Sequence, residues 1–151
     1  MTQVDAYDPA TDTWSSKAPL PTARYSMGSA VVNGLFYVIG GFGTTSVSSA
    51  VDVYDPALNT WSSKAALPSG RGRLAAGVVN NLIYAIGGTA GADAFGTTEV
   101  FDPAGNSGST KTLMPTARVD IGIGVVNGLI YVTGGRTAPS AYTPVTEVYH
   151  P

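Results

Sequence analysis

Cysteine is absent from this 151-residue chain, and histidine occurs once, at His150. The lack of cysteine excludes a disulfide framework, a thiolate metal site and a catalytic thiol together. The sequence has no run of about 18 consecutive apolar residues, the length that a membrane-spanning helix needs. No apolar segment preceded by positive charge follows Met1. We therefore expect a soluble chain with no signal peptide or transmembrane segment, in a compartment that the sequence leaves undecided.

Charge is also scarce. Charged residues make up 12% of the chain against 44% hydrophobic residues, and the net charge is −2. Such a chain has enough apolar surface for a core, so global disorder is excluded. Its lysines and arginines are dispersed, whereas nucleic acids and anionic membranes select clustered ones. We expect no nucleic-acid partner and no membrane partner.

The chain does contain an internal repeat. Tyr7-Asp8-Pro9 recurs as Tyr54-Asp55-Pro56 and as Phe101-Asp102-Pro103, so the period is 47 residues (54 − 7 and 101 − 54). The same spacing links Trp14 to Trp61, Arg24 to Arg71 and Arg118, and Gly40-Gly41 to Gly87-Gly88 and Gly134-Gly135. Residues 1–151 therefore form one repeat region, with copies at about 4–50, 51–98 and 99–147 and partial strands at both ends.

Each copy has the signals of two hairpins. Asn33-Gly34 separates two β-branched or aromatic runs, as a two-residue type I′ turn requires. Asp55-Pro56 favours a type I turn between the next two runs. Residues 42–49, 89–97 and 136–144 are rich in Gly, Ser, Thr and Ala and are predicted to be exposed loops. The sequence thus predicts an all-β fold with four short antiparallel strands in each copy and no helix.

The pattern resembles the Kelch repeat. Apolar residues lead into a glycine pair, as in Tyr37-Val38-Ile39-Gly40-Gly41, and Tyr54 and Trp61 follow. The resemblance implies Kelch-type β-propeller blades, about three in this chain, arranged radially around a channel. The third copy departs from the pattern because Gly108 occupies the tryptophan position, and we expect a looser outer edge there.

Three blades cannot close a ring, since propellers have about four to eight. The chain begins at a third strand, 4–8, and ends after another, 145–149, so its ends are complementary parts of one blade. Two chains about a two-fold axis would complete each other by strand exchange. We therefore expect a homodimer that forms a six-bladed ring. Both terminal segments are third strands and compete for one place; the alternative is a piece excised from a longer array.

The repeated arginines Arg24, Arg71 and Arg118 precede the first strand of each copy. One interpretation is an anion-binding ring, and the other, which we favour, is a hydrogen bond that every blade needs, to the Asp-Pro turn or to loop carbonyls. Positions that differ between copies are better candidates for binding. The Kelch resemblance places the ligand face near the residues after each arginine and after each glycine pair. It nominates Tyr25, Arg73, Asp120, Phe42, Phe95, Arg136 and Tyr142.

Two functions remain open. The first is a non-catalytic scaffold that presents variable loops to a protein or peptide, for which aromatic and arginine side chains are suited. The second is a carbohydrate or small-ligand site, with mutarotase chemistry like that of the bacterial sialic-acid Kelch enzymes. The copper radical oxidases that share the architecture need a cysteine and histidine ligands, whereas this chain has no cysteine and only one histidine, His150. We expect no metal, no cofactor and no catalytic residues; Glu99 and Glu147, at the starts of third strands, are poorly placed as an acid and base.

Overall fold

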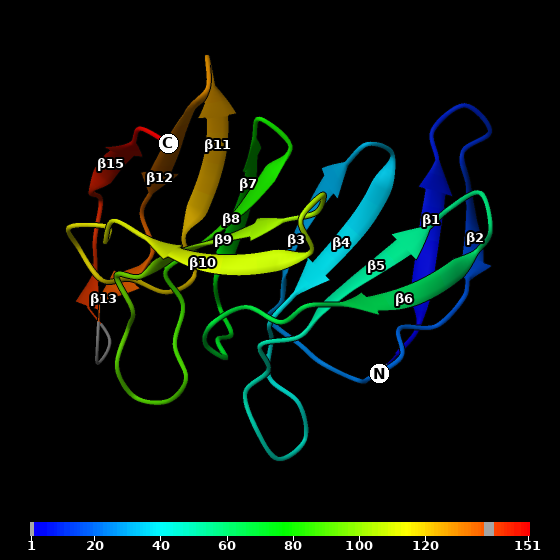
Figure 1. Ribbon diagram of the computed structural model, residues 1–151, viewed down its shortest axis with the longest axis horizontal. Helices are drawn as coiled ribbons and strands as arrows, with labels where there is room; N and C mark the ends of the chain where they lie inside the picture. The colour runs from blue at the N-terminus through cyan, green and yellow to red at the C-terminus, as the bar shows by residue number, and fades with distance from the viewer. Residues whose placement is uncertain (1, 138–140) are drawn as a thin grey trace.

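The computed structural model describes residues 2–137 and 141–151, and its regular structure consists of β-strands (Figure 1). The strands are β1 (Val4–Asp8), β2 (Thr13–Lys17), β3 (Gly28–Val32), β4 (Leu35–Ile39), β5 (Val51–Asp55), β6 (Thr60–Lys64), β7 (Ala75–Val79), β8 (Leu82–Ile86), β9 (Thr98–Asp102), β10 (Ser107–Lys111), β11 (Gly122–Val126), β12 (Leu129–Thr133), β13 (Arg136–Thr137), β14 (Ala141–Tyr142) and β15 (Thr146–Tyr149). The prediction of an all-β chain is confirmed.

The strands form separate antiparallel sheets in chain order. Two sheets have four strands, β3-β4-β5-β6 and β7-β8-β9-β10. The last sheet has three strands, β11-β12-β15, and the N-terminal hairpin β1–β2 stands alone. The sheets are therefore two complete blades between two partial ones, as the repeat predicted. Part of a predicted loop is ordered as a short ladder, because Arg136 and Thr137 pair with Tyr142 and Ala141.

The turns have the backbone that their residues favour. Asn33 and Gly34 have φ values of 51° and 77°, so both central positions are left-handed, as in a type I′ turn. Asn80 and Asn81 adopt the same conformation without glycine, at 51° and 61°. The turns between β5 and β6 and between β9 and β10 are also left-handed at their asparagines.

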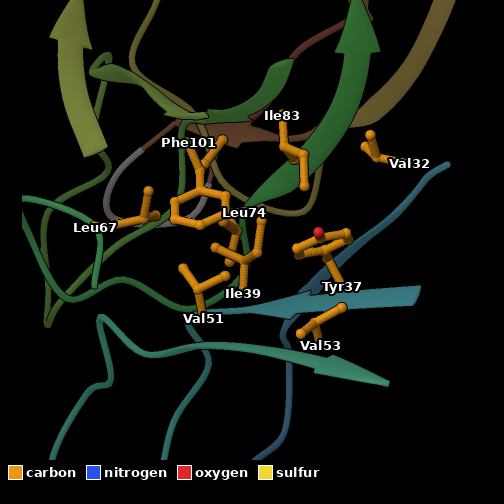
Figure 2. Packing of buried hydrophobic residues seen from close by; sticks show 10 residues of the cluster. Val32, Tyr37, Ile39, Val51, Val53, Leu67, Leu74, Ile83 and Phe101 are labelled. Carbon is orange, nitrogen blue, oxygen red and sulfur yellow. The ribbon is translucent and has the colours of Figure 1, made fainter. Parts of the chain in front are cut away.

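The core lies between the sheets. Side chains from the first complete blade, among them Ile39 and Val51, face Ile83 and Phe101 of the second (Figure 2). Leu67, from the segment that connects the two blades, fills the same layer. A second cluster joins the second blade to the last sheet, with Met114 in the place of Leu67. Because each sheet packs on its neighbours, the copies form one stack.

The glycine pairs lie where one copy meets the next. A side chain on Gly87 would come within 2.6 Å of the backbone oxygen of Arg118, which is one copy further on. The amide of Gly88 donates to that same oxygen at 2.9 Å. Both glycines have positive φ, at 65° and 93°. The pair is therefore required for close approach as well as for backbone conformation.

The outer edge between copies is closed by tryptophan in one place and by glycine in another. The indole Nε1 of Trp61 donates to the backbone oxygen of Ala18 at 2.8 Å, across the boundary with the hairpin. Trp61 also packs against Tyr54, with ring centroids 5.2 Å apart. At Gly108 the preceding connection lies so close that a Cβ would be 3.0 Å from the Ala66 oxygen. The prediction of a looser outer edge in the third copy is thus wrong, because the backbone at Ala66 and Leu67 fills the place that the indole takes at the first boundary.

Candidate functional site

Each copy holds one arginine in a buried ion pair. Arg24 contacts Asp52 at 2.5 Å, Arg71 contacts Glu99 at 2.5 Å, and Arg118 contacts Glu147 at 2.7 Å. The side chains of all three arginines are at most 2% exposed. Each acid lies near the start of the third strand of the same sheet. These arginines are therefore not free to bind an external anion.

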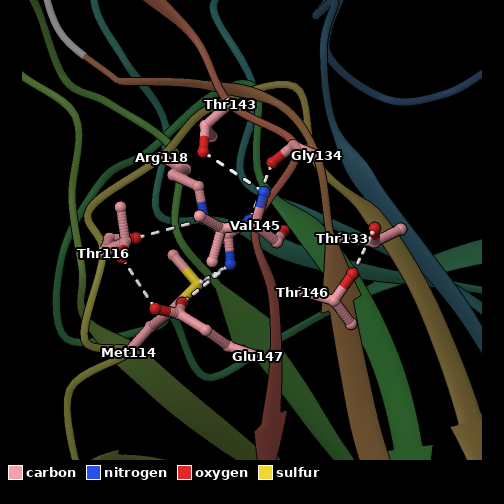
Figure 3. Close-up of polar contacts among 9 residues, drawn as sticks. All are labelled: Met114, Thr116, Arg118, Thr133, Gly134, Thr143, Val145, Thr146 and Glu147. Atoms are coloured by element: carbon pink, nitrogen blue, oxygen red, sulfur yellow. Dashed lines mark hydrogen bonds and ion pairs between the residues drawn. The ribbon is translucent and has the colours of Figure 1, made fainter.

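The same arginines also hold the loops. Arg118 donates from Nη1 to the backbone oxygens of Gly134 and Val145, at 2.9 and 2.7 Å (Figure 3). Arg71 makes the equivalent bonds to Gly87 and Thr97, at 3.2 and 3.0 Å. Of the two partners considered from sequence, Arg71 and Arg118 contact the loop carbonyls, whereas Arg24 donates to the hydroxyl of Ser48 at 3.2 Å. Burial lowers the pKa of Arg71, and the attraction of Glu99 opposes this.

Two residues after each arginine the backbone is left-handed. Ser26, Arg73 and Asp120 have φ values of 53°, 56° and 55°, although none is glycine. The amide of Arg73 donates to the Ser26 oxygen at 2.8 Å, and the amide of Asp120 donates to the Arg73 oxygen at 3.1 Å. This ladder between copies fixes a backbone that costs an L-residue about 1–2 kcal/mol. It places three different side chains in a row at equivalent positions.

Charged groups meet along this row. The carboxylate of Asp120 lies between two guanidinium groups, 2.7 Å from Nη2 of Arg136 and 3.6 Å from Nε of Arg73. The Asp120 and Arg73 side chains are 41% and 44% exposed, in contrast to the buried pairs. The hydrogen bond from Arg136 to Asp120 raises the pKa of Arg136. Two cations against one anion leave an excess positive charge at the surface.

Aromatic side chains extend the row. The rings of Tyr25 and Phe42 are 5.4 Å apart, and Tyr25 is 64% exposed. The Phe42 ring lies over Gly72, where any Cβ would overlap it, so the aromatic pair is adjacent to Arg73. At the other end Tyr142 pairs with Arg136 across β13 and β14 and is 84% exposed. We call Tyr25, Phe42, Arg73, Asp120, Arg136 and Tyr142 the variable row.

Phe95 lies apart from the variable row. Its ring packs against the buried arginine of its own copy, with the guanidinium carbon of Arg71 5.5 Å from the ring centroid. Its backbone oxygen accepts from the amide of Arg118 at 3.2 Å. The structure therefore gives Phe95 contacts within the frame, whereas it brings the other six nominated residues together.

The hollows along the row are shallow or small. A cleft of about 40 Å³ lies between Arg73 and Arg136 and is lined also by Thr89 and Thr137. An open groove of about 320 Å³ borders Tyr25 and Phe42. Enclosed sites for small ligands are usually about 300–1,000 Å³. Within residues 2–137 and 141–151 no three His, Asp or Glu side chains gather as metal ligands. The same residues include no helix long and apolar enough to span a membrane.

A comparison with protein families decides the identity of the fold. The model of the Kelch motif matches residues 23–68 and 70–107, which is more than half of the chain. The chain belongs to the Kelch family. The first matched repeat carries the glycine pair, Tyr54 and Trp61, whereas the second has the glycine pair but Phe101 at the tyrosine position. The predicted family is confirmed.

Individual proteins agree with this Kelch assignment. The human Kelch repeat and BTB domain-containing protein 12 is 49% identical over 37 residues, which are 24% of this chain and 6% of that protein. The solved structure of YjhT superposes with a TM-score of 0.91 at 20% identity, covering 99% of this chain and 56% of that one. The chain thus spans a small part of its curated relative and about half of YjhT. At this identity the likeness to YjhT shows the fold alone.

Sequence reasoning did not find the partners of the buried arginines, although a signal was present. Asp52, Glu99 and Glu147 follow the arginines by 28, 28 and 29 residues (52 − 24, 99 − 71 and 147 − 118). A spacing between opposite charges that changes by at most one residue from copy to copy indicates an ion pair. The contact between Asp120 and Arg73 had no such signal, because it joins two copies and depends on how the sheets pack.

Proposed function

We propose that the Kelch blades of this chain act as a non-catalytic scaffold that binds a protein or peptide through the variable row. The observation that carries this proposal is the row of exposed side chains from successive copies. Its central members, Arg73 and Asp120, have left-handed backbone. Each of them follows, by two residues, an arginine that is held in a buried ion pair. Arginine and aromatic residues supply much of the energy of protein interfaces. A rigid frame with side chains that differ between copies suits recognition.

The chemistry of the row favours an acidic partner that also carries apolar side chains. Arg73 and Arg136 share one carboxylate, so their charge is not fully neutralised. Carboxylates bind arginine through paired, charge-assisted hydrogen bonds. Tyr25 and Phe42 border an open groove, and the Phe42 ring lies over Gly72, the neighbour of Arg73 in the chain. An acidic peptide with an aromatic or aliphatic residue matches both features.

Several features favour binding over catalysis. The acids Asp52, Glu99 and Glu147 each pair with a buried arginine, and Asp120 pairs with the exposed Arg73 and the half-buried Arg136. A general acid or base must contact its substrate, and the buried ion pairs leave the carboxylates of Asp52, Glu99 and Glu147 little exposed to one. The cleft between Arg73 and Arg136 is also much smaller than a sugar-sized site.

Selection from a random peptide library displayed on phage tests this proposal. We expect the wild-type chain to enrich acidic peptides, and the R73A/R136A variant to bind them at least tenfold more weakly in calorimetry. The K17A/K64A variant is the matched control, since it removes two positive charges from fourth strands, outside the row. Equal affinity of the selected peptides for all three proteins would contradict the proposal.

A further inference from the structure

The boundary between neighbouring copies has a fixed set of polar contacts. The amide of Ala18, just after one fourth strand, donates to Oδ1 of Asn59 in the next copy at 2.8 Å. Ala65, one period later, makes the same bond to Asn106 at 2.9 Å. At the first boundary Trp61 adds its indole bond to the Ala18 oxygen. A turn asparagine and a fourth-strand residue therefore meet the connecting segment of the copy before.

At one end of the molecule this arrangement lacks its connecting segment. In the hairpin β1–β2, Asp12 and Trp14 stand one period before Asn59 and Trp61, and Asp12 has the same left-handed backbone, with φ of 53°. The hydroxyl of Tyr7 donates to Asp12 as that of Tyr54 donates to Asn59. Yet Trp14 is 70% exposed, and Tyr7 is 46% exposed against 6% for Tyr54. The hairpin is formed, but its binding face is uncovered.

At the other end the connecting segment lacks its hairpin. Thr112 stands one period after Ala65, and Leu113 beside it is 60% exposed. A cleft of about 280 Å³ lies between residues 112–115 and β15. It occupies the place that corresponds to Trp61 at the first boundary and to Gly108 at the second. The cleft is mostly apolar, with Leu113, Met114 and Pro115 in its wall.

The face of the last sheet is also uncovered. Tyr131 is 36% exposed, whereas its equivalents Tyr37 and Tyr84 are 3% and 4% exposed. A Cβ on Gly77 would lie 3.1 Å from Ile123 of the next copy, but one on Gly124 would meet nothing within 4 Å. The face of the last sheet at Tyr131 and Gly124 is therefore uncovered.

We propose that a second copy of this chain covers these open faces, with its β1–β2 hairpin seated beside Thr112. The indole of Trp14 of each protomer enters the cleft of the other protomer and donates a hydrogen bond to the backbone oxygen of Thr112 there. The carboxylate of Asp12 accepts a hydrogen bond from the amide of the same Thr112. The hairpin and β15 lie at opposite ends of the molecule (Figure 1), so one chain cannot make this contact with itself. Two chains related by a two-fold axis satisfy both ends, and the assembly stops at two.

The partner's hairpin takes the place of β15 at the edge of β12. Asp5 stands one period before Asp52. Its carboxylate accepts a hydrogen bond from the hydroxyl of Ser16, just as that of Asp52 accepts one from Ser63. It therefore replaces Glu147 as the partner of Arg118, and Tyr7 replaces Tyr149. The hairpin also brings a fourth strand, which β15 lacks. The partner of Arg118 and the third-strand tyrosine are thus replaced, and the contact of Trp14 is added.

Cysteine cross-linking tests the contact directly, because the chain has no cysteine of its own. In the D12C/T112C variant we expect oxidation to give a covalent dimer on a non-reducing gel. The A18C/N59C variant is the matched control, since the amide of Ala18 and the side chain of Asn59 are bonded within one chain. It should cross-link without a change of mass. A monomeric D12C/T112C protein, under conditions in which the control is fully oxidised, would overturn the proposal.

Light scattering supplies the second measurement. Wild-type protein should have twice the 15.4 kDa mass of one chain, and W14A should raise the dissociation constant at least tenfold. L58A, which truncates another exposed side chain outside the contact, should leave it unchanged. A wild-type monomer at concentrations up to about tenfold above those of the cross-linking, or a mass that rises without limit, would refute the closed pair.

Two acid substitutions test the exchange of strands. D5N removes the acid that the partner's Arg118 needs in the dimer, so it should weaken association at least tenfold. E147Q weakens only the β15 contact that the dimer gives up, so it should strengthen association. Effects of the same sign, or no effect from D5N, would show that β15 keeps its place.

Discussion

At the residue scale, arginine has two roles in this chain, which burial separates. Arg71 is fully buried against Glu99, while Arg73, two residues later, is 44% exposed beside Asp120. In a poorly solvated place the loss of one partner leaves an uncompensated charge, whereas at the surface water replaces it. The first pair therefore holds the fold, and the second is available for a partner.

The substitution E99Q tests this difference. It keeps the shape of the side chain and leaves Arg71 buried without its counter-charge, so we expect a loss of about 3–5 kcal/mol in the free energy of unfolding. D120N at the surface should cost about 0–1 kcal/mol. Urea denaturation followed by circular dichroism measures both. A loss from E99Q as small as that from D120N would contradict the structural role.

At the element scale, the strands and turns were predictable because their signals are local. Asn33-Gly34 fixes a hairpin by the backbone of two residues, and the period of 47 repeats that hairpin through the chain. The arginine and acid partners were also present in the sequence as a spacing of 28 or 29 residues. The pairing of Arg136 and Thr137 with Tyr142 and Ala141 was not predictable, because the residues around them give no strand pattern. The variable row was nominated only through the family resemblance, since its contacts join different copies.

The turn at Asn80-Asn81 gives a prediction at this scale. N81G relieves a left-handed asparagine at φ of 61°, and we expect it to stabilise the chain by about 1 kcal/mol, the low end of the usual cost of that conformation. G34N makes the reverse change in the first hairpin and should destabilise by a similar amount. Thermal denaturation of the two variants measures the difference. Changes of the same sign in the stability of the two variants would show that the left-handed turn backbone does not determine the stability of these hairpins.

At the scale of the whole molecule, stability rests on the layers between sheets. Tyr37 and Tyr84 lie in the two core clusters, and burial raises the pKa of each above the usual 10.0; a nearby Tyr149 adds to the effect at Tyr84. The folded chain therefore keeps these phenols protonated at a pH that ionises them in the unfolded chain. Their contribution to stability is complete below pH 10 and is lost as the pH rises further.

We accordingly expect the free energy of unfolding to fall steeply above about pH 10. In the Y37F/Y84F variant this fall should be shallower, because two groups no longer titrate. Y25F, which alters an exposed tyrosine, should follow the wild type. Urea titrations between pH 8 and pH 11 measure the slopes, and identical slopes for all three proteins would exclude ionisation of the core as the cause.

The ladder through Ser26, Arg73 and Asp120 has one more consequence. The backbone at these positions is held by hydrogen bonds between main-chain atoms of neighbouring copies. This backbone therefore does not depend on which side chains the three residues carry. Residues that tolerate left-handed backbone, such as Asn, Asp and Ser, can replace one another there, while β-branched ones are disfavoured. The side chains at these three neighbouring positions can thus be changed without a change in the blades that carry them. A small combinatorial library at these positions would explore new ligands while each member keeps the same blades.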